Sequence, residues 1–242
     1  MNARPLQHPS SSRRRQHGFS LLELGVVLLV IGLLLGAVAI GRDLQRSAAN
    51  QRLSTDFVQG WQLAYEGYVN GVGYPPGDNP AAPTGRVNGN VAPAGTVLCG
   101  NGMINTFLAA GIRLPEGRTE GQPDRYVYLD SNGNPQEVQV CFQSVNWAEA
   151  GAAVGAYVTR PRNVMVMRNV TGSLAGMLDQ QIDGKSDARF GRFRDIAQAN
   201  AVAVVAGQIW PVDDRMTFGT VVANTRDEDQ VAVTTAYFQM FR

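Results

Sequence analysis

Apolar residues occupy almost every position between residues 19 and 41, a run of 23 residues with one charged member, Glu23. At about 1.5 Å per residue, a helix of this length spans the hydrocarbon core of a bilayer, which is about 30 Å thick. A helix buried in a soluble protein rarely runs this far without a polar face. The pattern therefore predicts a transmembrane helix over residues 19–41.

The apolar pattern then changes from continuous to periodic. Aromatic and apolar residues recur every three or four positions among charged ones, which places them on one face of a helix: Leu53, Phe57, Trp61, Tyr65 and Tyr68. We expect one continuous helix from Phe19 to about Val69, whose amphipathic second part, residues 42–70, packs on a globular domain. The Pro- and Gly-rich residues 71–98 predict turns without regular structure.

From residue 126 the pattern is mainly that of short strands. We expect strands at residues 126–129, 137–143, 163–170 and 231–241, shorter apolar stretches at 201–210 and 216–223, and helices at 103–110 and 174–182. Gly133, within residues 130–134, favours a hairpin turn between the first two strands. The expected fold class is α+β, with an antiparallel sheet in a globular head, residues 99–242, packed on the second half of the long helix.

Charge is distributed unevenly along the chain. The formal net charge of the 242 residues is +1, but the first 18 residues hold four arginines and no acid, so the remainder carries −3. Basic residues before an apolar run favour a cytoplasmic location for residues 1–18 and transfer of the rest across the membrane. A mildly acidic body argues against nucleic acid as a partner, because phosphate binding needs clustered cations.

Several kinds of catalytic site are excluded by composition. Both histidines, His8 and His17, lie in the first 18 residues, so the rest of the chain cannot build a Ser-His or Cys-His pair or a His-ligated zinc site. The one lysine, Lys185, has no glycine pattern of a phosphate-binding loop around it. We therefore expect no enzyme activity, no cofactor and no metal site.

Glu23 is the anomaly of the apolar run. An unpaired carboxylate within a membrane costs about 2.5–3.5 kcal/mol, so such a residue is a functional candidate whose partner must be cationic and lie in the membrane. A secretory signal peptide fits less well, because its apolar core has about 7–15 residues and is followed by a small-x-small cleavage site.

The hexapeptide GFSLLE, residues 18–23, lies between a basic segment and an apolar run. In this setting it resembles the N-terminal signature of type IV prepilins and of the pseudopilins of type II secretion. The resemblance implies a pilin-like fold, cleavage between Gly18 and Phe19 by a prepilin peptidase that removes residues 1–18 as a leader, and methylation of the new amine of Phe19. It also implies that Glu23 neutralises the N-terminal amine of an adjacent subunit.

Cys99 and Cys141 are the only cysteines, and the predicted topology places both outside the cytoplasm. A disulfide is the preferred interpretation. Two unpaired core thiols are the alternative. Metal ligation is disfavoured, because no histidine or third cysteine can complete a site.

Acidic residues in the second half of the head raise the question of calcium, which favours several carboxylate ligands. They are Asp179, Asp183, Asp187 and residues 227–229. Their spacing does not match an EF-hand loop. We expect solvated acids, with Arg189, Arg192 and Arg194 close enough to pair with them.

The function expected from this resemblance is that of a structural subunit, a minor or atypical pilin, of a type IV pilus. Its partners would be the prepilin peptidase, other pilin or pseudopilin subunits, the inner-membrane assembly platform and the membrane. Before assembly the head would lie in the periplasm. Alternatives are a pseudopilin of a type II secretion system and a bitopic inner-membrane protein with a periplasmic binding domain.

Overall fold

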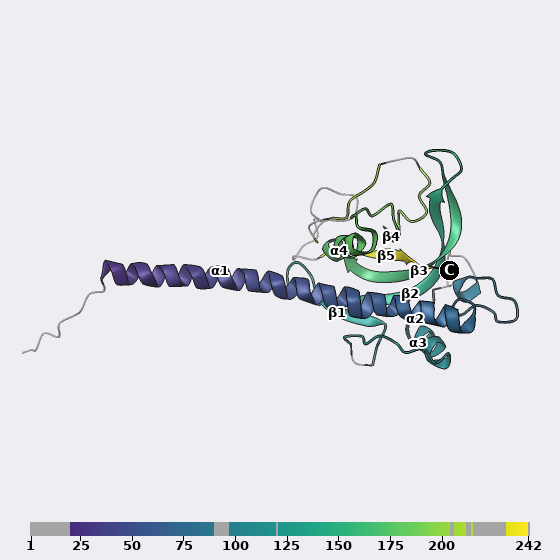
Figure 1. The fold of residues 1–242 in the computed structure, drawn as a ribbon, viewed down its shortest axis with the longest axis horizontal. Coiled ribbons are helices and arrows are strands. Elements are labelled where there is room, and N and C mark those ends of the chain that lie inside the picture. The colour runs from purple at the N-terminus through teal and green to yellow at the C-terminus, as the bar shows by residue number, and fades with distance from the viewer. Residues whose placement is uncertain are drawn as a thin grey trace, which may run out of the picture. The chain divides into compact units, whose positions relative to one another are not determined.

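The computed structural model describes residues 20–89, 97–119, 121–203, 206–211, 214 and 231–241 (Figure 1). The chain divides into two compact units, residues 1–45 and residues 46–242. From here on, "the head" means the whole second unit, which includes the last part of the long helix as well as residues 99–242. Helix α1 (Leu21–Arg52) contributes to both units. A π-helical turn, η1 (Leu53–Val58), and helix α2 (Gln59–Val72) follow without a break.

The sheet of the head has five strands, all antiparallel, in the order β1-β2-β3-β5-β4. They are β1 (Arg125–Leu129), β2 (Pro135–Ala150), β3 (Tyr157–Thr171), β4 (Phe193–Asp195) and β5 (Val233–Gln239). The remaining elements are η2 (Val87–Gly89), α3 (Gly100–Ala109) and α4 (Gly172–Asp183). The expected α+β class, a long apolar N-terminal helix with an antiparallel sheet, is confirmed.

The π-helical turn was not predicted, although the sequence contains its cause. Leu53, Phe57 and Trp61 are each four residues apart and all completely buried. In an α-helix of 3.6 residues per turn, repeated steps of four drift around the helix axis. A π-helical turn is wider, because its hydrogen bonds run from i to i+5, so it keeps these three side chains facing the same core.

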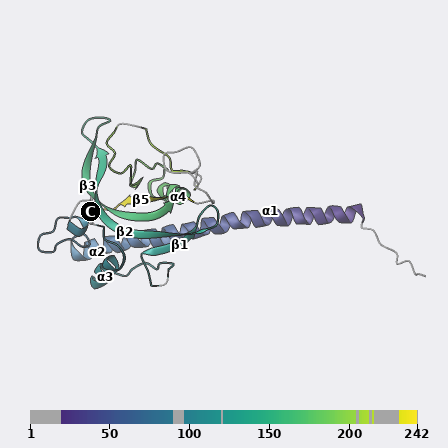
Figure 2. The ribbon, with the colours of Figure 1, turned by 180° about the vertical axis from the view of Figure 1, so that it is seen from behind.

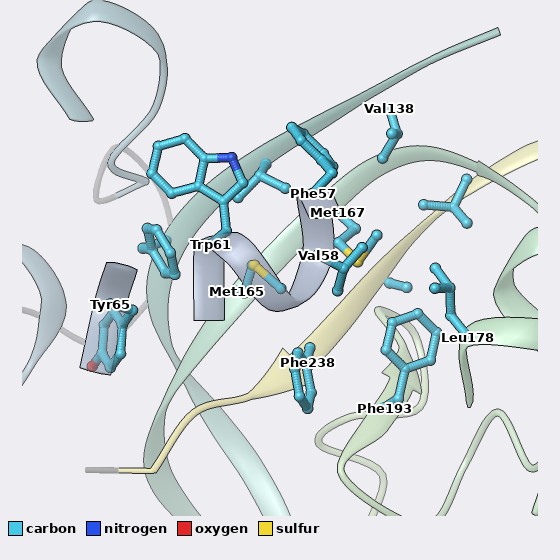
Figure 3. Close-up of a cluster of buried hydrophobic side chains, with 14 of the residues drawn as sticks. Phe57, Val58, Trp61, Tyr65, Val138, Met165, Met167, Leu178, Phe193 and Phe238 are labelled. Atoms are coloured by element: carbon cyan, nitrogen blue, oxygen red, sulfur yellow. The ribbon is translucent and has the colours of Figure 1, made fainter. Parts of the chain in front are cut away.

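Trp61 is a completely buried member of the first hydrophobic core, which lies between helix and sheet (Figure 3). Its ring centroid is 5.6 Å from that of Phe107 in α3 and 6.0 Å from that of Phe142 in β2. Its indole Nε1–H donates to the carbonyl of Pro123 at 3.1 Å, so the buried polar atom of the ring is also satisfied. This one side chain therefore connects α2 with α3, β2 and the segment before β1.

The opposite face of the sheet carries a second, smaller core. Residues alternate between the two faces of a strand, so Phe142 points to the helix while its neighbour Cys141 points away, together with Val145 and Trp147. Cys141 forms a disulfide with Cys99, with an S–S distance of 2.01 Å. Leu98 pairs with Phe142 through two backbone hydrogen bonds of 2.8 and 2.9 Å, so residues 97–99 lie alongside β2.

Strands β2 and β3 form a hairpin that is longer than the sequence pattern predicted, as Figures 1 and 2 show. The sequence pattern did not predict the part of β3 around Pro161, because a proline usually argues against a strand. Pro161 pairs with Asn146 of β2. Two residues further along β2, the N–H of Ala148 points away from β3 and donates to the carbonyl of Ala199. By the alternation of antiparallel pairs, the missing donor of Pro161 is therefore on the outer edge of β3.

The hairpin turn at residues 130–134, the helices α3 and α4, and strands β1 and β5 lie where the sequence predicted them. Gly133 has φ +85 and donates to the carbonyl of Asp130. Residues 201–203 and 206–210, the described part of the first apolar stretch, form no strand. Residues 216–223, the other apolar stretch, lie outside the described residues.

Asp78 organises the loop after α2. Its carboxylate is 5% exposed and accepts four hydrogen bonds, from the backbone N–H groups of Asn79, Thr84 and Gly85 and from the hydroxyl of Thr84, at 2.8–3.0 Å. Burial alone would raise the pKa of Asp78, but these donors outweigh burial and hold the pKa below its ordinary value. The loop is thus held by one buried charge.

Two glycines of α2 give a matched test of how closely the loop before β1 packs on the helix. A Cβ at Gly60 would lie 2.7 Å from Cβ of Pro115, whereas a Cβ at Gly67 would have its nearest neighbour, Cδ1 of Ile112, at 3.8 Å. We predict that Gly60→Ala lowers the free energy of unfolding by about 1–3 kcal/mol through overpacking. Gly67→Ala should raise it by up to about 1 kcal/mol, because alanine favours a helix over glycine. Thermal unfolding of the full chain in detergent measures both; equal effects would show that the helix and the loop are not in tight contact.

The disulfide closes a loop with a sequence separation of 42 residues. We predict that the double variant Cys99→Ser/Cys141→Ser lowers the free energy of unfolding by about 2–5 kcal/mol, since the unfolded chain loses a cross-link. Denaturant unfolding with and without a reductant provides the measurement. The reductant should change the native protein and leave the double variant unaffected; an unchanged native protein would mean that the two thiols are not joined.

Candidate processing and assembly segment

The first described residue, Ser20, caps the N-terminus of α1. Its hydroxyl Oγ accepts a hydrogen bond of 3.2 Å from the N–H of Glu23, and its carbonyl accepts one of 3.1 Å from the N–H of Leu24. A serine in this position satisfies one of the backbone donors that a helix leaves free at its start. The helix therefore begins at Leu21, directly after Ser20, the third residue of the hexapeptide.

Sequence reasoning singled out Glu23 but not Ser20. The signal for Ser20 was present, because Ser20 and Glu23 have the S-x-x-E spacing of a capping box. An acid in the first turn is also favoured by the positive end of the helix dipole. Glu23 thus occupies a position where its charge is compatible with helix formation, whatever its partner.

Glu23 is exposed, and none of the ion pairs within residues 20–241 that the structure describes involves it. Gly18 and Phe19, the predicted cleavage residues, lie outside the described residues. The structure therefore places the carboxylate at the start of α1 but brings no described cation to it.

The first part of α1 is apolar on every side. The window Leu21–Val38 has a mean hydropathy of 2.7. Among the described residues, α1 is the one helix that is long enough and apolar enough to cross a membrane. Its large side chains are all at least 46% exposed, including Leu21 at 90% and Leu35 at 67%. A helix without a polar face needs an apolar environment around it, and the part of the chain that the structure describes does not supply one.

Three glycines share one face of this apolar helix. Gly25, Gly32 and Gly36 are spaced by seven and four residues, which are positions on the same side of an α-helix. A Cβ at any of them would meet no atom within 4 Å. These glycines therefore have no packing partner among the residues that the structure describes.

The prediction of solvated acids was wrong for Asp179 and Asp187, while Asp183 is half-buried. Asp179 is completely buried and Asp187 is 5% exposed. The Oδ2 atom of Asp183 accepts hydrogen bonds of 2.8 and 2.9 Å from the N–H groups of Arg192 and Phe193. The carboxylates satisfy backbone donors of the segment after α4, which a sequence pattern does not reveal.

No group of three or more His, Cys, Asp or Glu among the described residues is arranged to hold a metal ion. Residues 227–229, the other acids considered for calcium, lie outside those residues.

The predicted pairing of three arginines with these acids is not what the structure shows. Arg194 lies 4.3 Å from the ring centroid of Trp147 and donates to the carbonyls of Ala148 and Gly191, both at 2.8 Å. Arg192 lies 3.8 Å from the ring centroid of Phe241. Guanidinium groups bind aromatic faces and carbonyls well, so these arginines hold the chain together without an ion pair.

Asp214 is a further buried acid that sequence reasoning missed. Its Oδ2 accepts from the N–H of Ser131 at 2.9 Å and its Oδ1 from the N–H of Ser173 at 2.8 Å. The Arg46 guanidinium lies 4.0 Å from the same carboxylate. Asp214 thus links the β1–β2 turn, the start of α4 and the last part of α1, a role that no local pattern signals.

Comparison with known proteins identifies the N-terminal segment. A family model described as the prokaryotic N-terminal methylation motif matches residues 13–39. No curated protein and no solved structure matches the chain. The matched residues contain the hexapeptide, Glu23 and the apolar part of α1, so the resemblance to prepilins is confirmed. The chain carries the N-terminal methylation motif that is the hallmark of type IV pilin-like, prepilin-type proteins.

Proposed function

We propose that this protein is a structural subunit, a minor or atypical pilin, of a type IV pilus. The observation that carries the proposal is the coincidence of the methylation motif at residues 13–39 with the segment Leu21–Val38 of α1, which is apolar on all sides and is not buried by any of the described residues. A filament in which such helices pack together buries this surface, at about 25 cal/mol per Å² of apolar area.

Processing would expose the residue that starts the helix. Cleavage between Gly18 and Phe19 leaves Phe19 as the new N-terminus, with Ser20 capping α1 directly behind it. Methylation of the Phe19 amine keeps its positive charge. A prepilin peptidase is the partner that the motif implies for both steps.

Glu23 supports assembly in this proposal. In the apolar surroundings of packed helices, a carboxylate is stable only with a cation beside it. The N-terminal amine of an adjacent subunit is such a cation, and attraction between opposite charges is stronger in a low-dielectric layer than in water. The pair would attract a subunit to the growing end and fix its position along the filament axis.

The proposed location follows from charge and redox chemistry. The arginines before the apolar helix favour a cytoplasmic N-terminus, so the head would stand in the periplasm until assembly. The Cys99–Cys141 disulfide fits this placement, because disulfides persist in oxidising compartments such as the periplasm.

A pseudopilin of a type II secretion system is the second candidate. The methylation motif supports it equally, because both kinds of subunit share this N-terminus. A bitopic inner-membrane protein with a retained N-terminal segment is the third, and it requires that Gly18–Phe19 is not cleaved.

We predict that Glu23→Gln is cleaved normally but is incorporated into filaments at least about tenfold less, which corresponds to about 1.4 kcal/mol. Glutamine keeps the capping-box geometry and removes the charge, so the variant separates charge pairing from helix capping. Immunoblots of sheared and membrane fractions give the measurement. Asp56→Ala, which removes an exposed acid of η1, is the control and should assemble normally. Normal incorporation of Glu23→Gln would contradict amine pairing.

We predict that Gly18→Leu leaves an uncut precursor in the membrane, because a peptidase must approach the backbone closely and a bulky side chain prevents this. Gly25→Leu, a glycine of the helix in open space, should be cut as efficiently as the native chain. The electrophoretic mobility of membrane-fraction protein distinguishes precursor from product. If Gly18→Leu is cut normally, the cleavage site lies elsewhere.

Mass spectrometry of the N-terminal peptide separates the three candidates. A methylated peptide that begins at Phe19 in the sheared filament fraction is expected for a pilus subunit. The same peptide in washed membranes alone would favour a pseudopilin. A peptide that begins at Met1 in both fractions would contradict assembly into any filament of this class.

A further inference from the structure

Asp179, in α4, binds two residues that follow the helix and are far apart in sequence, Asp187 and Trp210. Its Oδ2 accepts a hydrogen bond of 2.6 Å from the N–H of Asp187 and one of 2.7 Å from the indole Nε1–H of Trp210. Its other oxygen, Oδ1, is buried and has no hydrogen-bond partner. A buried acceptor without a donor is costly and needs an explanation.

Three features of its position disfavour a negative charge on Asp179. The residue is completely buried, so water cannot solvate the charge. It lies near the C-terminal end of α4, which ends at Asp183 and has no basic residue in its last turn, so the negative end of the helix dipole is not compensated. Asp183 is four residues further along, on the same face of the helix.

The neighbouring cations are engaged elsewhere. Lys185 lies 3.4 Å from Oδ2 of Asp187, and the guanidinium of Arg194 is on the ring of Trp147. Arg192 stacks on Phe241. On strand β4, which packs against α4, the buried Asp195 is a further acid. Among the described residues, none of the ion pairs includes Asp179.

We propose that Asp179 is a protonated carboxylic acid in the folded head and that its proton, on Oδ1 and directed to Asp183, keeps Asp187 and Trp210 clamped to α4. The O–H donor removes the unsatisfied acceptor, and Oδ2 remains free to accept from Asp187 and Trp210. When the proton leaves to solvent, two carboxylates face each other beside a helix C-terminus and the clamp weakens. This device belongs to the head and does not depend on how the chain assembles.

The titration of the group agrees with this geometry. Burial raises the pKa of Asp179 to about 7, with Asp183 acting in the same direction and the hydrogen bonds from Trp210 and Asp187 acting against it. Because the folded-state pKa is raised above the unfolded one, the stability that the proton contributes is complete below about pH 4. It is lost as the pH rises to about 7.

Asp78 provides a matched contrast within the same head. It is also buried and also accepts backbone hydrogen bonds, but its pKa is lowered, so it acts as a carboxylate. Asparagine reproduces a protonated aspartate: its oxygen accepts and its amide donates. Asp179→Asn should therefore preserve the clamp, while Asp78→Asn places an amide donor among donors and should destabilise its loop at neutral pH.

The test uses the full chain in detergent micelles with ¹⁵N-labelled tryptophan. The three tryptophans give three indole signals, and the Trp210 signal is assigned with Trp210→Phe. In the native chain, the chemical shift of the Trp210 indole should titrate with a midpoint near 7. In Asp179→Asn the same signal should be independent of pH between 5 and 9, and in Asp183→Asn the midpoint should move to lower pH.

Thermal unfolding provides an independent readout. The melting temperature of Asp179→Asn should equal that of the native chain near pH 4 and exceed it at pH 8, whereas Asp78→Asn should melt below the native chain at pH 8. The proposal is overturned if the indole signal does not titrate in the native chain, or if it titrates unchanged in Asp179→Asn. It is also overturned if Asp179→Asn is destabilised at pH 8 as strongly as Asp78→Asn, because Asp179 would then be needed as a carboxylate.

Discussion

The head depends on the contact between the aromatic face of α2 and the inner face of the sheet. Trp61, Tyr65 and Phe142 fill this space, with the rings of Tyr65 and Phe142 5.1 Å apart. The requirement that these side chains face the sheet explains the π-helical turn before them, since without it Leu53 and Trp61 would turn away from one another around the helix. It also explains why the loop before β1 comes so close to Gly60 that no side chain fits there.

Much of the fold was accessible from the sequence, because its strongest elements have local signals. The apolar helix, the turn at Gly133 and helices α3 and α4 follow from periodicity and turn residues. The missing parts lack such signals: β4 has three residues, and the far end of the β2–β3 hairpin contains Pro161. Whether a strand continues there depends on a partner strand that is distant in sequence.

The candidate functional residues likewise divide into those with a local sequence signal and those without one. Glu23 was evident because a charge stands out in an apolar run, and the motif match confirms the segment around it. The buried aspartates were misinterpreted as solvated, because acids in a polar stretch give no sign of burial. Their role appears only when the irregular segment after α4 is seen to donate backbone N–H groups that have no sheet or helix partner. Here aspartate side-chain oxygens accept the backbone N–H hydrogen bonds that backbone carbonyls accept in helices and sheets.

Pro161 has a consequence for the proposed location, in which the heads of many copies would stand at one membrane surface. Of the described residues of β3, those from Tyr157 to Pro161 pair with β2 alone, so their other edge is open. An open edge is a template for pairing with the strand of another molecule. Pro161 interrupts the row of donors along that edge. In the proposed location, crowded heads would therefore meet in the plane of the membrane without joining through their sheets into an aggregate.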